Sequence, residues 1–360
     1  MCKDHNTPLL TEEEYRNYLI VLEDESQEDV QSFLKLSTVE LLRKLIKYEN
    51  EMTKNIFDAL KERMKEITYT LNNDDSDALY SLIDNTDSPR DLLDIYQSSR
   101  YAYLVQQVEQ ELEEVNQYLK DELRDDMTEA YSRTYLGAGH ILSQILPSDV
   151  INSNSVPIEQ VDAMIESPNH GKTLYERIDD LTKHMNTIII GLMMQGMISG
   201  KSMPDIIGEI QKRLMGDVRR AEVITRTEIM RASNGGIIQL YKDNSDIVKG
   251  VEYVATLDLR TCSECGSHDG DRFLWDEPRP SLPLHPRCRC TYSPIVISVQ
   301  ELNDRFGLNL NNIPIPENER PTWEDWMRYQ IQRGNLEDAE LIRRIFGSRA
   351  GYESFVNQFN

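Results

Sequence analysis

The chain has 360 residues, with 62 acidic residues against 39 basic ones and a formal net charge of −23. This length suits two or three domains. Hydrophobic residues make up 39% of the chain, enough for a packed core, so a wholly disordered protein is excluded. The acidic total also excludes a protein that coats nucleic acid with its whole surface. A local basic face is still compatible with this net charge.

Neither a secretion signal nor a membrane span is expected. The first ten residues, MCKDHNTPLL, contain no apolar segment of the kind a signal peptide needs. The longest apolar stretch covers about residues 188–198, far fewer than the ~20 residues that cross a bilayer. We interpret this stretch as a buried core helix.

The N-terminal part, residues 1–146, has the pattern of long helices. Ser37 and Glu40 form a capping-box pattern ahead of an apolar stripe that continues to Met64, which predicts a helix start at Ser37. A second stripe between Leu104 and Leu119 is heptad-like over fewer than three heptads. It fits either an oligomerising coiled coil or an intramolecular helical bundle, and we favour the bundle.

Residues 147–172 are rich in Pro, Ser and Asn, which predicts a linker. A helical pattern then resumes from Leu174 to about Leu240. Within it, the Gly-Lys-Ser at 200–202 resembles the end of a phosphate-binding loop. That motif requires Gly at position 195, where this chain has Gln, so we prefer a helix end followed by a Ser cap.

The periodicity changes after residue 247. Val248–Leu257 carries β-branched and aromatic residues and is predicted to be a strand. Asp269-Gly270 predicts a tight hairpin turn, with Arg272–Trp275 as the returning strand. Four prolines between residues 278 and 286 predict an irregular loop, and Thr291–Val299 is predicted to be the last strand.

Four of the five cysteines cluster in the same region, together with a histidine. Cys262-Ser-Glu-Cys265 is a closely spaced pair, and a second set, His285-Pro-Arg-Cys288-Arg-Cys290, begins after nineteen intervening residues. Zn²⁺ prefers four tetrahedral thiolate and imidazole ligands, and two such half-sites joined by a loop can provide them. The candidate metal ligands are Cys262, Cys265, His285, Cys288 and Cys290.

The preferred ligand set combines the first pair with His285 and Cys288. Cys290 is an alternative to His285, because Cys288 and Cys290 share a face if the segment is extended. Four protein ligands leave no open position for water, so we expect one structural zinc ion and no catalytic residue. The nearby acids that a catalytic site would draw on are Asp258, Asp269 and Asp271.

The order of motifs around this cluster resembles the phage Mu F-like head-morphogenesis domain over about residues 175–296. The resemblance rests on an Arg-Thr-Glu helix, an Asp-x-Arg-Thr-Cys-x-x-Cys segment, an Asp-Gly pair and a His-Pro-x-Cys-Arg-Cys segment. The motif residues outside the ligand set are Arg226, Glu228, Asp258, Arg260, Asp269, Gly270 and Arg289. We expect Arg226 and Glu228 to dock their helix on the zinc module, and Arg260 and Arg289 either to face them or to support Asp258.

The resemblance implies a minor structural protein of a tailed-phage head that is bound at the portal vertex. Its expected role is procapsid assembly, DNA packaging or DNA delivery. Expected partners are the portal protein, scaffolding or major capsid protein, and packaged double-stranded DNA. The implied location is inside the virion capsid near the portal, after synthesis in the cytoplasm of a bacterial host.

One segment of the acidic chain is basic. Residues 212–242 contain seven Lys or Arg and three Asp or Glu. Its candidate contacts to DNA or to an acidic portal surface are Lys212, Arg213, Arg219, Arg220 and Arg231. The alternative is a solvated helix face with pairs such as Glu222 with Arg226.

The resulting fold class is a mainly α protein with a small α+β C-terminal module, in which a short β-hairpin is stapled by zinc. The expected divisions are 1–146, a helical N-terminal region; 147–172, a linker; 173–299, the head-morphogenesis domain, with its zinc module at about 250–296; and 300–360, a helical tail. Two other functions compete with the structural one, namely a zinc-dependent phage hydrolase or nuclease and a zinc-ribbon DNA-binding protein.

Overall fold

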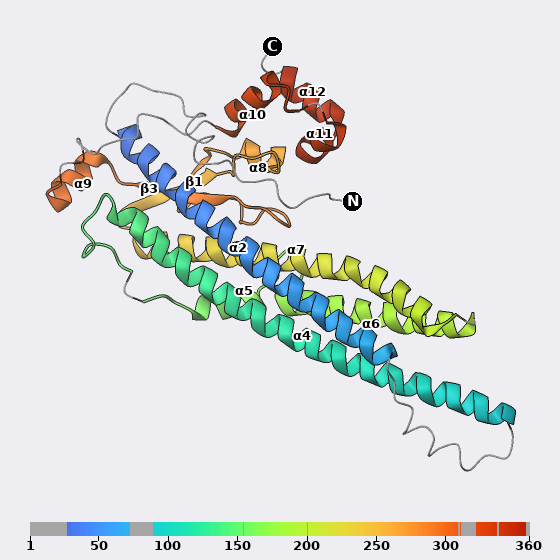
Figure 1. Cartoon of the computed structure of the whole chain (residues 1–360). Helices are drawn as coiled ribbons and strands as arrows, with labels where there is room; N and C mark the ends of the chain where they lie inside the picture. The colour runs from blue at the N-terminus through green and yellow to red at the C-terminus, as the bar shows by residue number, and fades with distance from the viewer. Residues whose placement is uncertain are drawn as a thin grey trace. The chain divides into compact units, whose positions relative to one another are not determined.

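The computed structural model describes residues 27–72, 89–153, 155–199, 201–308, 310, 322–336 and 338–357. Long helices precede a small antiparallel sheet, which confirms the predicted mainly α fold class with a small α+β C-terminal module (Figure 1). The helices are α2 (Gln27–Asn72), α4 (Pro89–Ser143), α5 (Glu159–Glu166), α6 (Leu174–Ile198), α7 (Met203–Asp243), α8 (Ser263–Ser267), α9 (Val299–Phe306), α10 (Trp323–Gln332), α11 (Ala339–Phe346) and α12 (Arg349–Asn357). The strands are β1 (Val248–Val254), β2 (Arg272–Leu274) and β3 (Thr291–Val296).

The chain divides into two compact units, each built from separated stretches of sequence. The sheet unit comprises the described residues of Met1–Glu49, Met127–Ile158 and Ile229–Asn360. The helical unit comprises those of Asn50–Asp126 and Glu159–Glu228. These units do not test the four divisions expected from the sequence, whose boundaries stay a prediction.

Helix α2 begins at Gln27, so the predicted helix start at Ser37 is wrong. Ser37 is instead an interior residue whose hydroxyl donates to Gln144 Oε1 at 3.0 Å. The neighbouring Thr38 hydroxyl donates to the Leu34 carbonyl one turn earlier at 2.8 Å. Hydroxyl side chains are favoured at helix N-termini but are tolerated inside helices when satisfied in this way, which makes the capping pattern ambiguous.

In the helical unit the apolar stripe of α4 is buried within the chain itself. Its residues are between 1% and 4% exposed, which confirms the intramolecular bundle: Leu104, Val108, Leu112, Val115 and Leu119. Helix α6 is amphipathic rather than wholly buried, because Ile189 is buried while Ile198 is 81% exposed. The interpretation of residues 188–198 as a fully buried helix is therefore corrected. None of the helices in the described part of the chain has both the length and the apolar character to cross a membrane.

The predicted Ser cap ahead of α7 is confirmed. Helix α6 ends at Ile198 and α7 begins at Met203, so Ser202 directly precedes the new helix. The Ser202 hydroxyl oxygen accepts from the Asp205 backbone N–H at 3.4 Å. This is the usual role of a serine at a helix N-terminus.

The sheet has the order β2-β1-β3, with β1 antiparallel to both neighbours. The pairing of β1 with β2 is as predicted. The predicted tight hairpin between them is wrong, because α8 lies in the connection between the two strands. Gly270 has φ +90° and donates to the Tyr253 carbonyl at 2.9 Å. The Asp269-Gly270 turn therefore returns the chain from α8 to the edge of β1.

The first turns of α2 pack on this sheet. Gln31 Nε2 donates to the Pro294 carbonyl of β3 at 3.0 Å. Lys35 forms an ion pair with Glu252, a β1 residue that is 2% exposed and is also bound by Arg272 Nε at 3.0 Å. Two cations thus neutralise the buried carboxylate, which fixes the helix on the sheet beside the cysteine-rich loops.

Candidate metal centre

The first half-site is a turn formed around the short helix α8. Cys262 is the N-cap residue of α8, and its sulfur accepts from the Cys265 backbone N–H at 3.5 Å. Cys265 lies within the first turn and is 2% exposed, whereas Cys262 is half-buried. The two-residue spacing therefore places both sulfurs at the same end of α8.

The second half-site is a β-turn that begins at His285. The Cys288 N–H donates to the His285 carbonyl at 3.0 Å, and Arg287 has φ +66°. Pro286 is the second residue of the turn, where the φ that the proline ring imposes is suitable. Arg287 is the third residue, where this kind of turn needs a positive φ. The turn brings His285 and Cys288 to one side of the loop, toward α8.

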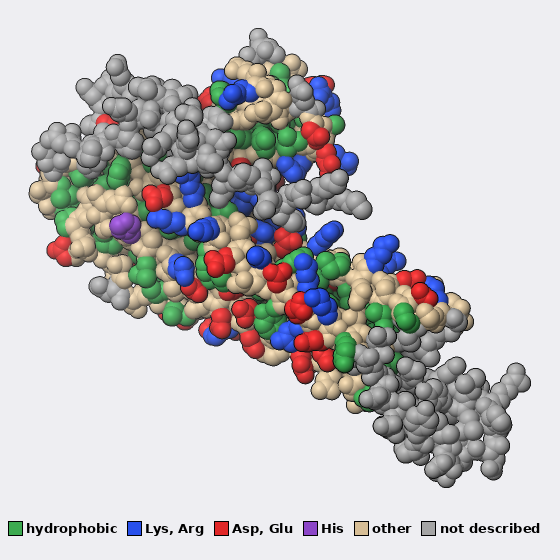
Figure 2. Space-filling view, viewed as in Figure 1, with side chains coloured by type: hydrophobic (Ala, Val, Ile, Leu, Met, Phe, Trp, Pro, Cys, Tyr) green, Lys and Arg blue, Asp and Glu red, His purple; other side chains and the backbone are tan. Residues whose placement is uncertain are grey.

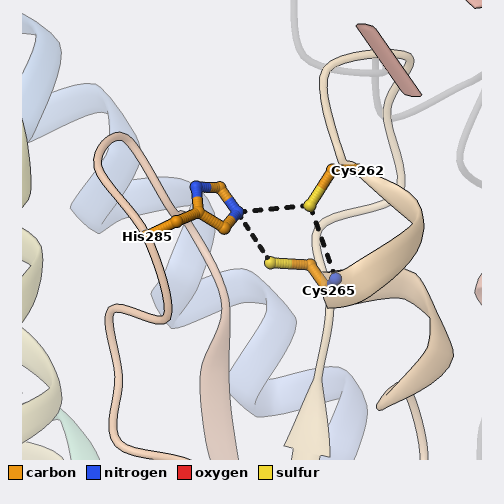
Figure 3. Close-up of side chains that lie close together, drawn as sticks. All are labelled: Cys262, Cys265 and His285. Carbon is orange, nitrogen blue, oxygen red and sulfur yellow. Dashed lines mark hydrogen bonds between the residues drawn. The ribbon is translucent and has the colours of Figure 1, made fainter. Parts of the chain in front are cut away.

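The side chains of the two half-sites converge (Figure 3). His285 Nε2 lies 3.2 Å from Cys262 Sγ and 3.1 Å from Cys265 Sγ, and the ring points between the two sulfurs. Cys265 Sγ lies 3.7 Å from Cys288 Sγ. Tetrahedral zinc places sulfur ligands about 3.8 Å apart and sulfur and nitrogen ligands about 3.5 Å apart, so the donors fit such an ion with small adjustments.

The five candidate ligands form two groups that share Cys265. Cys262, Cys265 and His285 have their ligand atoms within 4.8 Å of one another, and so do Cys265, Cys288 and Cys290. All four cysteines are free thiols. This cluster could hold a metal ion. Cys290 lies beside Cys265 and Cys288. The fourth ligand can therefore be either His285 or Cys290, as expected from the sequence.

Without a cation, the crowded sulfurs cannot all ionise. Hydrogen bonds from Cys265 and His285 lower the pKa of Cys262 to about 4, while the bonds with Cys262 and Cys288 raise the pKa of Cys265. The Cys262 sulfur in turn raises the pKa of His285 to about 9. A bound divalent cation would remove this conflict, because it stabilises several thiolates at once.

Asp258 holds the loop before the first half-site. It is 7% exposed and accepts from Arg289 Nη2 at 2.8 Å and from the Arg260 backbone N–H at 2.8 Å. Burial alone would raise the pKa of Asp258, but Arg289 and Arg260 outweigh it and lower the pKa to about 2. Arg260 and Arg289 thus both bind the Asp258 carboxylate, which is one of the two roles expected for them.

The other two acids near the cluster are also engaged. Asp269 Oδ1 accepts from the Ala255 N–H and Oδ2 from the Trp323 N–H, each at 2.8 Å. Asp271 is exposed and lies 2.8 Å from Nδ1 of His268. Asp269 therefore ties together segments of backbone around α8.

The Arg-Thr-Glu part of α7 lies in the helical unit. Arg226 Nε donates to Glu222 at 3.1 Å, the predicted i,i+4 pair, and Arg226 Nη1 donates to Asn50 at 2.8 Å. The carboxylate of Glu228 accepts from Asn169 at 3.2 Å. None of these three partners belongs to the zinc module, and the expected docking of Arg226 and Glu228 on it stays a prediction.

Two buried residues outside the predicted site contact or face the cluster. Asn234 Nδ2, from α7, donates to the Cys290 carbonyl at 3.1 Å. Tyr253 of β1 is fully buried, and its burial together with nearby Cys290 and Cys288 raises the pKa of its hydroxyl. Asn234 and Cys290 are 56 positions apart, so no local sequence pattern links them.

Together, the fold and the site define a helical protein with a small sheet module and a Cys/His cluster suited to a metal ion. Residues 187–293 match the family described as Phage Mu protein F like protein. The match covers about the second half of α6, all of α7 and the entire cluster. It indicates a phage head-morphogenesis protein. Comparison with curated proteins and with solved structures gave no match.

Proposed function

We propose that this chain is a minor structural protein of a tailed-phage head, bound at the portal vertex inside the capsid. Its role there is in procapsid assembly and in DNA packaging or delivery, with the portal protein as the first partner and scaffolding or major capsid protein as others. The observation that carries this proposal is the family match over residues 187–293, which includes the whole Cys/His cluster.

The cluster binds one zinc ion in this proposal, with Cys262, Cys265, His285 and Cys288 as preferred ligands and Cys290 as the alternative. The zinc would be structural. Helix α8 has five residues and β2 has three, which is too little regular structure to be stable alone. A metal ion that joins the two half-sites supplies the missing folding free energy.

A metal-dependent hydrolase or nuclease is less well supported. Such a site needs a general base beside an open metal position. Asp258 is held by two arginines, and both oxygens of Asp269 accept backbone N–H groups. A free-standing zinc ribbon that binds DNA is also less well supported, because Cys265, Cys288 and Cys290 belong to the main hydrophobic core of the sheet unit.

A basic stripe on α7 is the proposed contact to packaged DNA or to an acidic portal surface. Lys212 and Arg219, and likewise Arg213 and Arg220, are seven residues apart, so all four lie on one exposed face of the helix. Arg220 also pairs with the buried Asp217 at 3.3 Å. On the face shown in Figure 2, basic and acidic side chains are interspersed over the helices. Arg231 is half-buried and is the weakest of the five candidates.

Purified protein is expected to bind double-stranded DNA with an affinity that falls as salt rises, because phosphate contacts release counterions. Arg219→Gln should weaken binding and reduce the slope of log affinity against log salt by about one. The matched control is Arg349→Gln, an exposed arginine of α12 outside the stripe. If DNA binding is unchanged but capture by purified portal is lost, the stripe serves the portal instead.

The direct test of the proposed function is a quantitative mass-spectrometric inventory of purified virions and procapsids. The protein should be present in both, in far fewer copies than the major capsid protein, and should cross-link to the portal. Its absence from both particles, together with detection in the soluble lysate of infected cells, would exclude a head protein and favour the regulator or the enzyme.

A further inference from the structure

The C-terminal helices form a small hydrophobic cluster of their own within the sheet unit, beside α8 (Figure 1). Helices α10, α11 and α12 supply most of its buried residues: Trp323, Trp326, Met327, Ile342, Ile345, Phe346 and Phe355. Leu336, from the connection between α10 and α11, completes the C-terminal part. Leu257 also belongs to this cluster, and it lies on the segment between β1 and the first half-site. The C-terminal helices are thus packed on the part of the chain that presents Cys262 and Cys265.

An apolar contact joins Trp323 to Gly266. A Cβ added at Gly266 would lie 2.1 Å from Trp323 Cδ2 and 2.3 Å from its Cε3. The indole ring therefore lies directly against the backbone of α8, one residue after Cys265. Trp323 is 1% exposed, which makes this one of the most buried contacts of the C-terminal cluster.

Polar contacts attach the same helices to the same segment. Asp269 Oδ2 accepts from the Trp323 N–H at 2.8 Å at the start of α10. Arg344 Nη2 of α11 donates to the Leu259 carbonyl at 3.2 Å. Together with Leu257 and Gly266, these contacts place the docking surface within residues 257–269, which surround the first half-site.

We propose that metal binding at the Cys/His cluster and docking of residues 322–357 are thermodynamically coupled. This rests on the proposed metal site. The ion holds α8 in its turn through Cys262 and Cys265, and the ordered α8 presents Gly266 and the Asp269 carboxylate to Trp323. Coupling of this kind is reciprocal, so the docked helices also raise the affinity for the ion.

Hydrogen–deuterium exchange of the full chain, zinc-loaded and after chelation, tests the first direction. Chelation should speed amide exchange in residues 322–357 by on the order of tenfold or more, while α4 keeps its protection. In zinc-loaded Gly266→Ala the same segment should lose protection although about one zinc per chain stays bound. The control is Gly208→Ala, an exposed glycine of α7 whose added Cβ meets nothing within 4 Å.

Competition with a chelator of known affinity tests the reverse direction. Trp323→Ala should weaken zinc binding by about tenfold, a usual size for coupling between two sites. Arg349→Ala, an exposed change in α12, should leave zinc affinity unchanged. Full protection of residues 322–357 after chelation, or unchanged zinc affinity in Trp323→Ala, would refute the coupling while leaving the metal site intact. A reduced protein that binds no zinc would refute both.

Discussion

Replacing Cys262 by serine should abolish metal binding and unfold residues 250–296 while the helical unit stays folded. Serine offers a hydroxyl where the ion needs a thiolate, and the remaining donors do not close the shell. Structural zinc in small modules contributes roughly 10–16 kcal/mol of binding free energy, so losing the ion removes most of what orders such short elements. Elemental analysis should give about one zinc per wild-type chain and only traces in the variant.

The matched control for Cys262→Ser is Ser263→Ala, a change in the next residue of the same turn that removes no ligand. It should keep both the zinc and the exchange protection of the module. The helical unit provides an internal reference, because none of the candidate ligands lies in it. Wild-type protein purified in reductant without zinc would show that the cluster is a set of buried thiols and not a metal site.

The choice between the two ligand sets follows from a second pair of variants. His285→Ala should lose the ion if His285 is a ligand, because its Nε2 lies between the two sulfurs of the first half-site. Cys290→Ser should then keep about one zinc per chain, with some loss of stability from a buried hydroxyl. The opposite pattern would assign the fourth position to Cys290.

The sequence predicted those parts of the site that depend on local spacing. The two half-sites could be recognised because each is set by a turn of a few residues, and the second of these turns contains Pro286. The docking of Trp323 on Gly266 joins residues 57 positions apart, and neither residue type is specific for such a contact. The predicted helix start at Ser37 is wrong because a capping pattern is ambiguous, and the tertiary partner of Ser37, Gln144, is 107 positions away.

The pair formed by Asp258 and Arg289 should be the most sensitive polar contact of the zinc module. Both side chains are largely buried, at 8% and 11% exposure. Asp258→Asn removes the charge that compensates Arg289, and breaking a buried ion pair from one side typically costs about 3–5 kcal/mol. The free energy of unfolding in urea should fall by this amount in Asp258→Asn.

Replacing both partners should be less harmful than replacing one. In the double variant Asp258→Leu with Arg289→Met no buried charge is left without its counter-ion, and stability should recover in part. Glu252 with Arg272 offers a comparison, because this pair is half exposed through Arg272 and has a second cation in Lys35. Arg272→Met should therefore lower stability by less than Arg289→Met does.

The pH dependence of stability distinguishes an ion pair from mere packing at Asp258. Its arginine partners lower its pKa from 3.8 to about 2, so the charged form stabilises the fold above pH 4. That stabilisation, roughly 2 to 3 kcal/mol, is lost as the pH falls through the range between these two values. The stability difference between wild type and Asp258→Asn should therefore be constant from pH 7 to about pH 5 and shrink below pH 4. Zinc held by the proposed site would be lost from both proteins on acidification, so the comparison cancels that shared effect. A difference that does not change with pH would mean that the charge of Asp258 does not contribute to stability.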